Sequence, residues 1–166
     1  MYTIGETVFY SVHGVCIIED IQDQTFSGTT KQYYVLRSHH DPSLRLFYPV
    51  EAENSKLSPV ASKQKAELVL DTFGNPPSEW MERPQERAFL YQKVMESGNT
   101  IDIAQMVNTI LRKKVELEAD QKKLYLQDAQ LLRQVSPILM EELAVSLGKT
   151  TDEVQKEIER LIEQPQ

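Results

Sequence analysis

Residues 8–21 of the chain read VFYSVHGVCIIEDI, and this stretch predicts the fold of the first third of the protein. Two runs rich in Val, Ile, Phe and Tyr, at 8–10 and 15–18, flank a break from Ser11 to Gly14. These residues favour a pleated, half-buried strand, and a break of about 3–5 residues containing Gly is typical of a hairpin loop. Gly14 can adopt backbone angles that a residue with a Cβ resists. The stretch therefore predicts a β-hairpin of a small β-domain.

The rest of the first 60 residues carries further strand signals and no helix signal. Residues 26–30 and 39–42 have the composition of turns, and the runs at 31–36 and 44–48 have the composition of strands. Four or five short strands at this spacing predict a small SH3- or Tudor-like β-barrel over residues 1–61.

The adjacent histidines His39 and His40 suggest a metal site as an alternative to a loop. Neighbouring side chains of an extended chain point apart, and no third ligand has a suitable spacing. We therefore interpret the pair as part of a solvated loop, and we expect neither a metal nor a cofactor.

The composition is that of an ordinary globular protein, with 166 residues of which 40% are hydrophobic and 26% charged. No apolar run approaches the roughly 20 residues of a membrane span, and no secretion signal opens the sequence. Cys16 is the single cysteine, which excludes an internal disulfide, and its place in a predicted strand favours a buried hydrophobe over a nucleophile. We expect a cytoplasmic protein with no membrane partner, and we favour a monomer.

The segment after the β-domain predicts a connection. Ser62 can cap a helix that runs to Phe73 and stops at Gly74, and residues 75–79 contain a Pro-Pro break. We therefore expect residues 62–83 to be a connecting helix and linker.

From Pro84 onward the pattern is helical, which predicts an all-α helical bundle over residues 84–166. Pro84 suits a first helical position, Ser97-Gly98 ends that helix, and Asn99 can cap the next one. The second helix carries a regular amphipathic stripe, formed by Ile103, Met106, Val107, Ile110 and Leu111. The whole chain is thus expected to be a two-domain α+β protein.

Three further signals divide the last third of the sequence. A polar stretch at 116–123 precedes the segment 124–135, and Ser136-Pro137 has the form of a cap and a first position that restart a helix. Thr150 with Glu153 forms a capping box for a last helix.

Two motifs in this region suggest functions that we set aside. Gly148-Lys149-Thr150-Thr151 resembles part of a phosphate-binding loop, but Leu143 occupies the position of the required earlier glycine. The segment 143–158 resembles a helix-turn-helix, but its second helix would present acidic side chains to phosphates, which repel them. A helix stop, a helix cap and a packing hairpin explain these residues better.

The sequence resembles the CarD family along nearly its whole length. Near the N-terminus the matching residues are Ile4, Gly5, Glu6, Tyr10, His13, Gly14, Val15, Glu19 and Ile21. In the helical half they are Ser97-Gly98-Asn99, Met106-Val107 with Ile110-Leu111-Arg112 and Lys114, and Glu142-Leu143-Ala144. The resemblance implies that the N-terminal module, which is similar to the polymerase-interacting domain of the transcription-repair coupling factor, docks on the β subunit of bacterial RNA polymerase. The expected contact is the strand Arg45, Leu46, Phe47, Tyr48 and Pro49, whose edge could pair with a partner strand.

The same resemblance implies that the helical half contacts promoter DNA. In the family a Trp-x-x-Arg motif before this half inserts its Trp at the edge of the melted promoter, and Trp80 and Arg83 keep that mutual spacing. They lie four residues earlier than the family pattern. Either one helical turn is inserted here, or the wedge is lost and Trp80 packs the linker onto one of the domains.

Charge points to one candidate DNA-binding region within an acidic protein. The net charge is −7, whereas the segment 83–123 carries eight basic and six acidic residues. The best candidates for DNA contacts are Trp80, Arg83, Arg87, Arg112, Lys113 and Lys114.

These observations predict a CarD-like transcription regulator that binds polymerase and stabilises open promoter complexes. No nucleophile with a base, metal set or phosphate loop is evident, so we do not expect an enzyme. The alternative is an adaptor that binds polymerase or another protein without touching DNA, which the acidic net charge favours.

Overall fold

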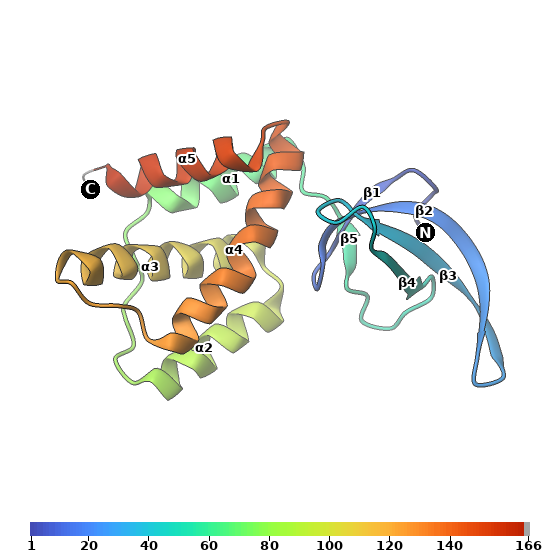
Figure 1. The fold of residues 1–166 in the computed structure, drawn as a ribbon, viewed down its shortest axis with the longest axis horizontal. Helices are drawn as coiled ribbons and strands as arrows, with labels where there is room; N and C mark the ends of the chain where they lie inside the picture. The colour runs from blue at the N-terminus through green and yellow to red at the C-terminus, as the bar shows by residue number, and fades with distance from the viewer. Residues whose placement is uncertain (165–166) are drawn as a thin grey trace. The chain divides into compact units, whose positions relative to one another are not determined.

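The computed structural model describes residues 1–164, and the chain divides into two compact units, Met1–Val60 and the part from Ala61 onward (Figure 1). The first unit is built of strands and the second of helices. This confirms the predicted two-domain α+β architecture.

The first unit is a five-stranded antiparallel sheet (Figure 1). Its strands are β1 (Thr7–Tyr10), β2 (Gly14–Phe26), β3 (Thr29–Ser38), β4 (Arg45–Pro49) and β5 (Leu57–Pro59). They lie in the order β4-β3-β2-β1-β5, which leaves β4 and β5 as the edges.

The stretch 8–21 forms the predicted hairpin at the centre of this sheet. β1 pairs with β2 from Thr7↔Ile17 to Tyr10↔Gly14, and Gly14 has φ of +83°. Val8, Cys16 and Ile18 are fully buried in the core of the unit. The side-chain types of this stretch suit that position because a buried strand selects β-branched and other apolar residues.

The turn predicted over residues 26–30 is shorter than expected. β2 continues to Phe26 and β3 begins at Thr29, so the turn consists of Ser27 and Gly28, with φ of +52° and +77°. Positive φ at both central residues is the geometry that matches the twist of a two-residue hairpin. Phe26, Thr29 and Thr30 are therefore strand residues, because the ladder continues to the pair Phe26↔Thr29.

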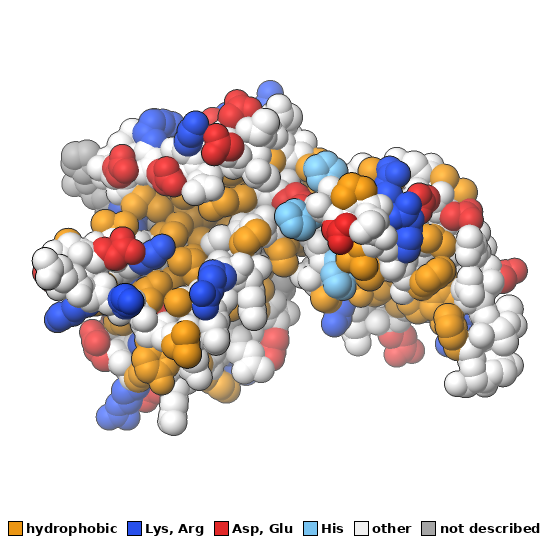
Figure 2. Space-filling view, in the orientation of Figure 1, with side chains coloured by type: hydrophobic (Ala, Val, Ile, Leu, Met, Phe, Trp, Pro, Cys, Tyr) orange, Lys and Arg blue, Asp and Glu red, His pale blue; other side chains and the backbone are white. Residues whose placement is uncertain are grey.

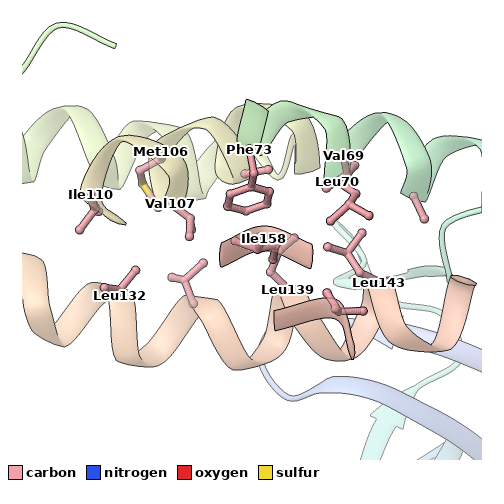
Figure 3. Packing of buried hydrophobic residues seen from close by; sticks show 14 of the residues in the cluster. Val69, Leu70, Phe73, Met106, Val107, Ile110, Leu132, Leu139, Leu143 and Ile158 are labelled. Atoms are coloured by element: carbon pink, nitrogen blue, oxygen red, sulfur yellow. The ribbon is translucent and has the colours of Figure 1, made fainter. Parts of the chain in front are cut away.

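The described part of the second unit contains five α-helices and a 3₁₀ turn. The helices are α1 (Lys63–Asp71), α2 (Pro84–Ser97), α3 (Thr100–Ala119), α4 (Leu126–Leu147) and α5 (Thr151–Glu163), and the 3₁₀ turn is Thr72–Gly74. Figure 3 shows their shared core, in which Phe73 lies near Val107 and Ile158. The predicted stripe of α3 is confirmed at its centre, since Met106, Val107 and Ile110 are buried.

Local capping signals positioned the helix ends correctly. The side chains of Ser62, Asn99 and Thr150 each accept a hydrogen bond from a backbone amide of the first turn that follows. Thr150 and Glu153 form the reciprocal capping box. Gly98 and Gly148 end α2 and α4 in the left-handed conformation.

The predicted helix break at Ser136-Pro137 was wrong. α4 runs through Pro137 without interruption, and Ser136 is not an N-cap. A proline inside a helix costs about 3 kcal/mol. Ending the helix at Pro137 would instead interrupt the continuous buried face that Leu132, Val135 and Leu139 form. The first part of the polar stretch at 116–123 belongs to α3, which continues to Ala119.

Residues 62–83, which we expected to connect the domains, belong to the helical unit. α1 contributes Ala66, Val69 and Leu70 to the core of that unit, and Phe73 is fully buried there. This segment joins the helical unit because its apolar side chains are stabilised only when they are packed against other apolar side chains.

Candidate functional site

The predicted polymerase-binding strand, β4, is an edge of the sheet. In the described structure its one strand neighbour is β3, with pairs from Tyr33↔Pro49 to Arg37↔Arg45. An edge strand leaves alternate backbone N–H and C=O groups without a ladder partner, so another chain can pair with it. The geometry required for strand addition is therefore present at β4.

Side chains of β4 alternate between the core and the outer face. Leu46 and Tyr48 pack against the core, and the Tyr48 hydroxyl accepts a hydrogen bond from the Lys56 amide at 2.8 Å. The Tyr48 ring also meets Tyr10 edge-on, with centroids 5.3 Å apart. Phe47 lies on the opposite face and is 50% exposed. Phe47 is therefore the apolar side chain that β4 offers to a partner, and Leu46 and Tyr48 hold the strand in place.

Arg45 is tied to its own unit. Its guanidinium forms an ion pair with Glu19 and donates to the Pro42 carbonyl. Arg37, the cross-strand neighbour of Arg45, approaches the same Glu19 carboxylate at 3.9 Å. Glu19 thus offsets part of the positive charge beside Phe47, and the surface here is both apolar and weakly basic.

In the helical unit, a polar face of α3 binds the segment that precedes α2. This face consists of Gln105, Asn108, Thr109 and Arg112, which share one side of the helix by their spacing. Asn108 donates to the Asn75 carbonyl at 3.0 Å, and Gln105 donates to the Pro76 carbonyl at 3.0 Å. The Ser78 amide donates to Thr109 Oγ1 at 3.0 Å. These hydrogen bonds fasten a Pro-rich segment that has no regular structure of its own.

Sequence reasoning missed this polar face. Asn108 and Thr109 are buried, at 0% and 3% exposure, and buried polar groups need hydrogen-bond partners. The signal was available, because Gln105, Asn108, Thr109 and Arg112 recur at helical spacing between the apolar residues of α3. What the sequence did not show was which backbone groups they would bind.

Trp80 follows this fastened segment and is half-buried against the helical core. The guanidinium carbon of Arg87 lies 4.4 Å from the centroid of its ring, and Lys113 Nζ lies at 5.5 Å. Cations at such distances are attracted to the face of an indole. The structure therefore brings together three of the predicted DNA-binding residues, but around a packed Trp80 rather than a fully exposed one.

Arg87 is not available for a DNA contact. It is 3% exposed, and its guanidinium donates three hydrogen bonds of 2.6 to 3.1 Å to the Asp128 carboxylate. A further N–H donates to the Met81 carbonyl at 2.6 Å. Hydrogen bonds to Asp128 raise the pKa of Arg87. Burial, with the charge of Asp128, raises the pKa of neighbouring Tyr91 to about 12.

Arg112 is likewise engaged inside the unit. Its guanidinium donates to the Phe73 carbonyl at 2.8 Å and to Asn108 Oδ1 at 2.9 Å. Both arginines were expected to bind DNA because their charges alone were visible in the sequence. In the folded chain their donors serve backbone and side-chain acceptors of the same unit.

Arg83, Lys113 and Lys114 remain as cations that can reach a partner. The Arg83 side chain is 82% exposed and approaches Glu86 at 3.4 Å. Lys113 and Lys114 approach Glu116 and Glu118 at 3.3 and 3.9 Å. Surface pairs of this kind contribute about 0–1 kcal/mol, so a phosphate can replace the carboxylate.

The segment 143–158 forms a packing hairpin. Val154 and Ile158 of α5 are buried, and Lys149 pairs with Glu157. Gly148 and Thr150 act as the stop and the cap.

Among the described residues, no helix is long and apolar enough to cross a membrane, and no three His, Cys, Asp or Glu side chains gather in a way that could hold a metal ion. Figure 2 shows hydrophobic side chains on the surface of the helical unit. Phe89 and Leu90 of α2 are 63% and 41% exposed, and Lys93 Nζ lies 5.0 Å from the centroid of the Phe89 ring.

The protein thus has two domains that each offer a surface for a partner. The sheet has an open edge at β4, and the helical unit carries Trp80 beside Lys113. Comparison with known proteins shows the family to which such a protein belongs. Residues 2–61 match the model of the CarD-like/TRCF RID domain, and residues 68–159 match that of the CarD C-terminal domain. The chain therefore belongs to the CarD-like family of transcription factors, which act in the regulation of transcription and interact with RNA polymerase.

A curated relative supports this assignment over nearly the full length. The chain is 25% identical to the "Putative transcription factor YdeB" of Bacillus subtilis (strain 168) over 156 residues. That alignment covers 93% of this chain and 97% of the relative. The similarity thus extends over nearly the full length of both chains.

Proposed function

We propose that this protein regulates transcription by binding the β subunit of RNA polymerase through β4 and by placing its helical domain on promoter DNA. The observation that carries the proposal is an open strand edge with an exposed Phe47 in a domain that matches the CarD-like/TRCF RID model. Main-chain pairing would supply affinity, and Phe47 would supply an apolar anchor.

Binding of the full chain to purified core polymerase tests the first half of the proposal. Phe47→Asp should weaken this binding about tenfold or more, because an apolar anchor at an interface centre contributes well over 1 kcal/mol. Phe26→Asp is the matched control, since Phe26 is 53% exposed on the same sheet but lies at the end of β2, a strand that does not pair with β4. Equal binding by both variants would contradict the assignment to β4.

In the helical domain, the proposed DNA surface consists of Trp80, Arg83, Lys113 and Lys114. Packing already restricts the position of the Trp80 ring, since the ring lies beside Arg87 and Lys113. An aromatic side chain held in one place can stack on a base where the duplex opens, and the cations beside it can contact phosphates. This arrangement would stabilise the melted segment of a promoter.

Trp80→Ala tests this second half. It should weaken binding to forked promoter DNA in the presence of polymerase and leave binding to closed duplex nearly unchanged, because stacking is repaid only where bases are already unpaired. Fluorescence anisotropy on forked and closed duplexes measures both. Equal loss on the two substrates would point to a general phosphate contact instead.

A second candidate is an adaptor that binds polymerase without contacting DNA. The engagement of Arg87 and Arg112 inside the helical unit favours it, because two of the expected phosphate-binding groups are already used. The adaptor predicts no salt-sensitive DNA binding by the wild type even when polymerase is present. Trp80→Ala would then lower thermal stability and change nothing else.

A further inference from the structure

We infer that Arg87 is a positioning residue for Trp80, and that its ion pair with Asp128 presents the indole in one orientation. This inference rests on the proposed function of Trp80 at the promoter. Arg87 itself would touch no DNA, because 3% of its surface is exposed.

Arg87 contacts Asp128, the carbonyl of Met81 and the ring of Trp80 at the same time. Asp128, 41 residues away at the start of α4, receives the guanidinium edge in three hydrogen bonds of 2.6 to 3.1 Å. The opposite donor binds the carbonyl of Met81, the residue next to Trp80, at 2.6 Å. The plane of the same guanidinium lies 4.4 Å from the Trp80 ring centroid. One side chain thus controls both the backbone beside Trp80 and the face of its ring.

The segment before Trp80 is fixed independently by α3. Gln105, Asn108 and Thr109 bind Pro76, Asn75 and Ser78. Trp80 therefore lies between two anchored points, Ser78 and Met81, in a stretch that has no helix or strand to orient it. Without Arg87 the Met81 side of this segment loses its hydrogen bond, and the indole keeps only its contacts with Lys113 and the helical core.

The planar fork of arginine is required for this arrangement. Five donors in one plane allow bidentate binding of Asp128, a bond to Met81 and stacking on an indole at the same time. A lysine could keep the charge near Asp128, but its compact ammonium has neither the bidentate fork for Asp128 nor a flat face to cover the ring.

The test uses Trp80 itself, because it is the one tryptophan of the chain. Replacing Arg87 with Met and Asp128 with Leu together removes the pair without leaving a buried charge unpaired. Acrylamide quenching of Trp80 fluorescence should increase about twofold as the covered face opens, and the emission maximum should shift. The matched control replaces Lys156 with Met and Asp152 with Leu, an exposed ion pair of α5, and should leave both readouts unchanged.

Arg87→Lys separates positioning from simple charge pairing. If Arg87 only neutralises Asp128, lysine restores the wild-type quenching; if it positions Trp80, quenching stays raised. The inference is overturned if the folded double variant keeps the wild-type emission and quenching. It is also overturned if Arg87→Lys keeps them. Should the double variant fail to fold, the same measurement on Arg87→Lys decides.

A second arm links positioning to the promoter. In the presence of polymerase, the double variant should lose as much affinity for forked DNA as Trp80→Ala, and adding Trp80→Ala to it should cause no further loss. Full forked-DNA affinity in a double variant whose Trp80 has become exposed would overturn the role at the promoter. If Trp80→Ala alone has no effect, the proposed function fails, while the fluorescence result still decides whether Arg87 positions Trp80.

Discussion

Buried polar side chains bind backbone groups inside the helical unit. Asn108 and Arg87 bind backbone carbonyls, whereas Glu142 of α4 is 4% exposed with a hydrogen bond of 3.4 Å from the Ala61 amide to its carboxylate. Burial raises the pKa of Glu142, and the Ala61 amide and the charge of Lys65 oppose that effect. Glu142 is therefore a group whose ionisation costs stability in the folded state.

Glu142→Gln should make stability less dependent on pH. Because the folded-state pKa of Glu142 is raised, the unfolded chain loses this proton first, and wild-type stability falls as pH rises from the ordinary value of about 4.5 through the folded value. The variant should match wild type in acid and be more stable at neutral pH. Urea unfolding across this range measures the difference.

Glu67→Gln is the control for Glu142→Gln. It makes the same change in charge at an exposed position of α1, so it should alter neutral stability little. An equal gain from both variants would attribute the effect to the net charge of −7 rather than to burial.

At the level of single elements, tertiary packing overrides one local signal in α4. Pro137 lies inside this helix at an exposed position, and Ser136 Oγ is buried without a hydrogen-bond partner among the described residues. A helix that began at Pro137 would have used Ser136 as its cap. The continuous buried face from Leu132 to Leu143 outweighs that local preference.

Pro137→Ala should therefore stabilise the helical unit by about 1–3 kcal/mol, because alanine restores an amide donor and removes the clash with the preceding turn. Thermal unfolding followed by circular dichroism checks this. Pro84→Ala is the matched control, since Pro84 occupies the first turn of α2, where proline is tolerated. No gain from Pro137→Ala would show that α4 has adapted to the proline at little cost.

At the scale of the whole molecule, the proposed DNA contact would bring an acidic protein to an acidic polymer. The net charge of −7 opposes DNA binding at long range, while Lys113 and Lys114 offer positive charge locally. Under the proposed function, two binding modules on one chain would reconcile these facts, because a domain held on polymerase would raise the effective concentration of the other near the promoter. Weak DNA affinity would then be sufficient for the proposed function.

Replacing Lys113 and Lys114 with Ala should flatten the salt dependence of DNA binding by up to about two units of log affinity per log salt, at roughly 0.9 per lost phosphate contact. Anisotropy at several salt concentrations measures the slope. The control replaces Lys149 and Lys156, which pair with Glu157 and Asp152 near and on α5, and should leave the slope unchanged. An equal change from both pairs would indicate a dependence on net charge alone.

Several features could be predicted from the sequence because residues near in the chain determine them. The hairpin at 8–21, the caps at Ser62, Asn99 and Thr150, and the buried stripe of α3 all follow from side-chain type and spacing within a few positions. The order of family motifs likewise indicated the CarD family, which both domain matches confirm.

Only the tertiary structure decided how the charged and aromatic residues are used. Arg87 and Asp128 are 41 positions apart, and Arg112 and Phe73 are 39 apart, so no local pattern revealed that these arginines are engaged. The same holds for Trp80, which packs beside Arg87 and Lys113, and for the segment 62–83, which joins the helical core. A sequence shows which groups carry charge or apolar surface, whereas burial and pairing depend on which distant segments the folded chain brings into contact.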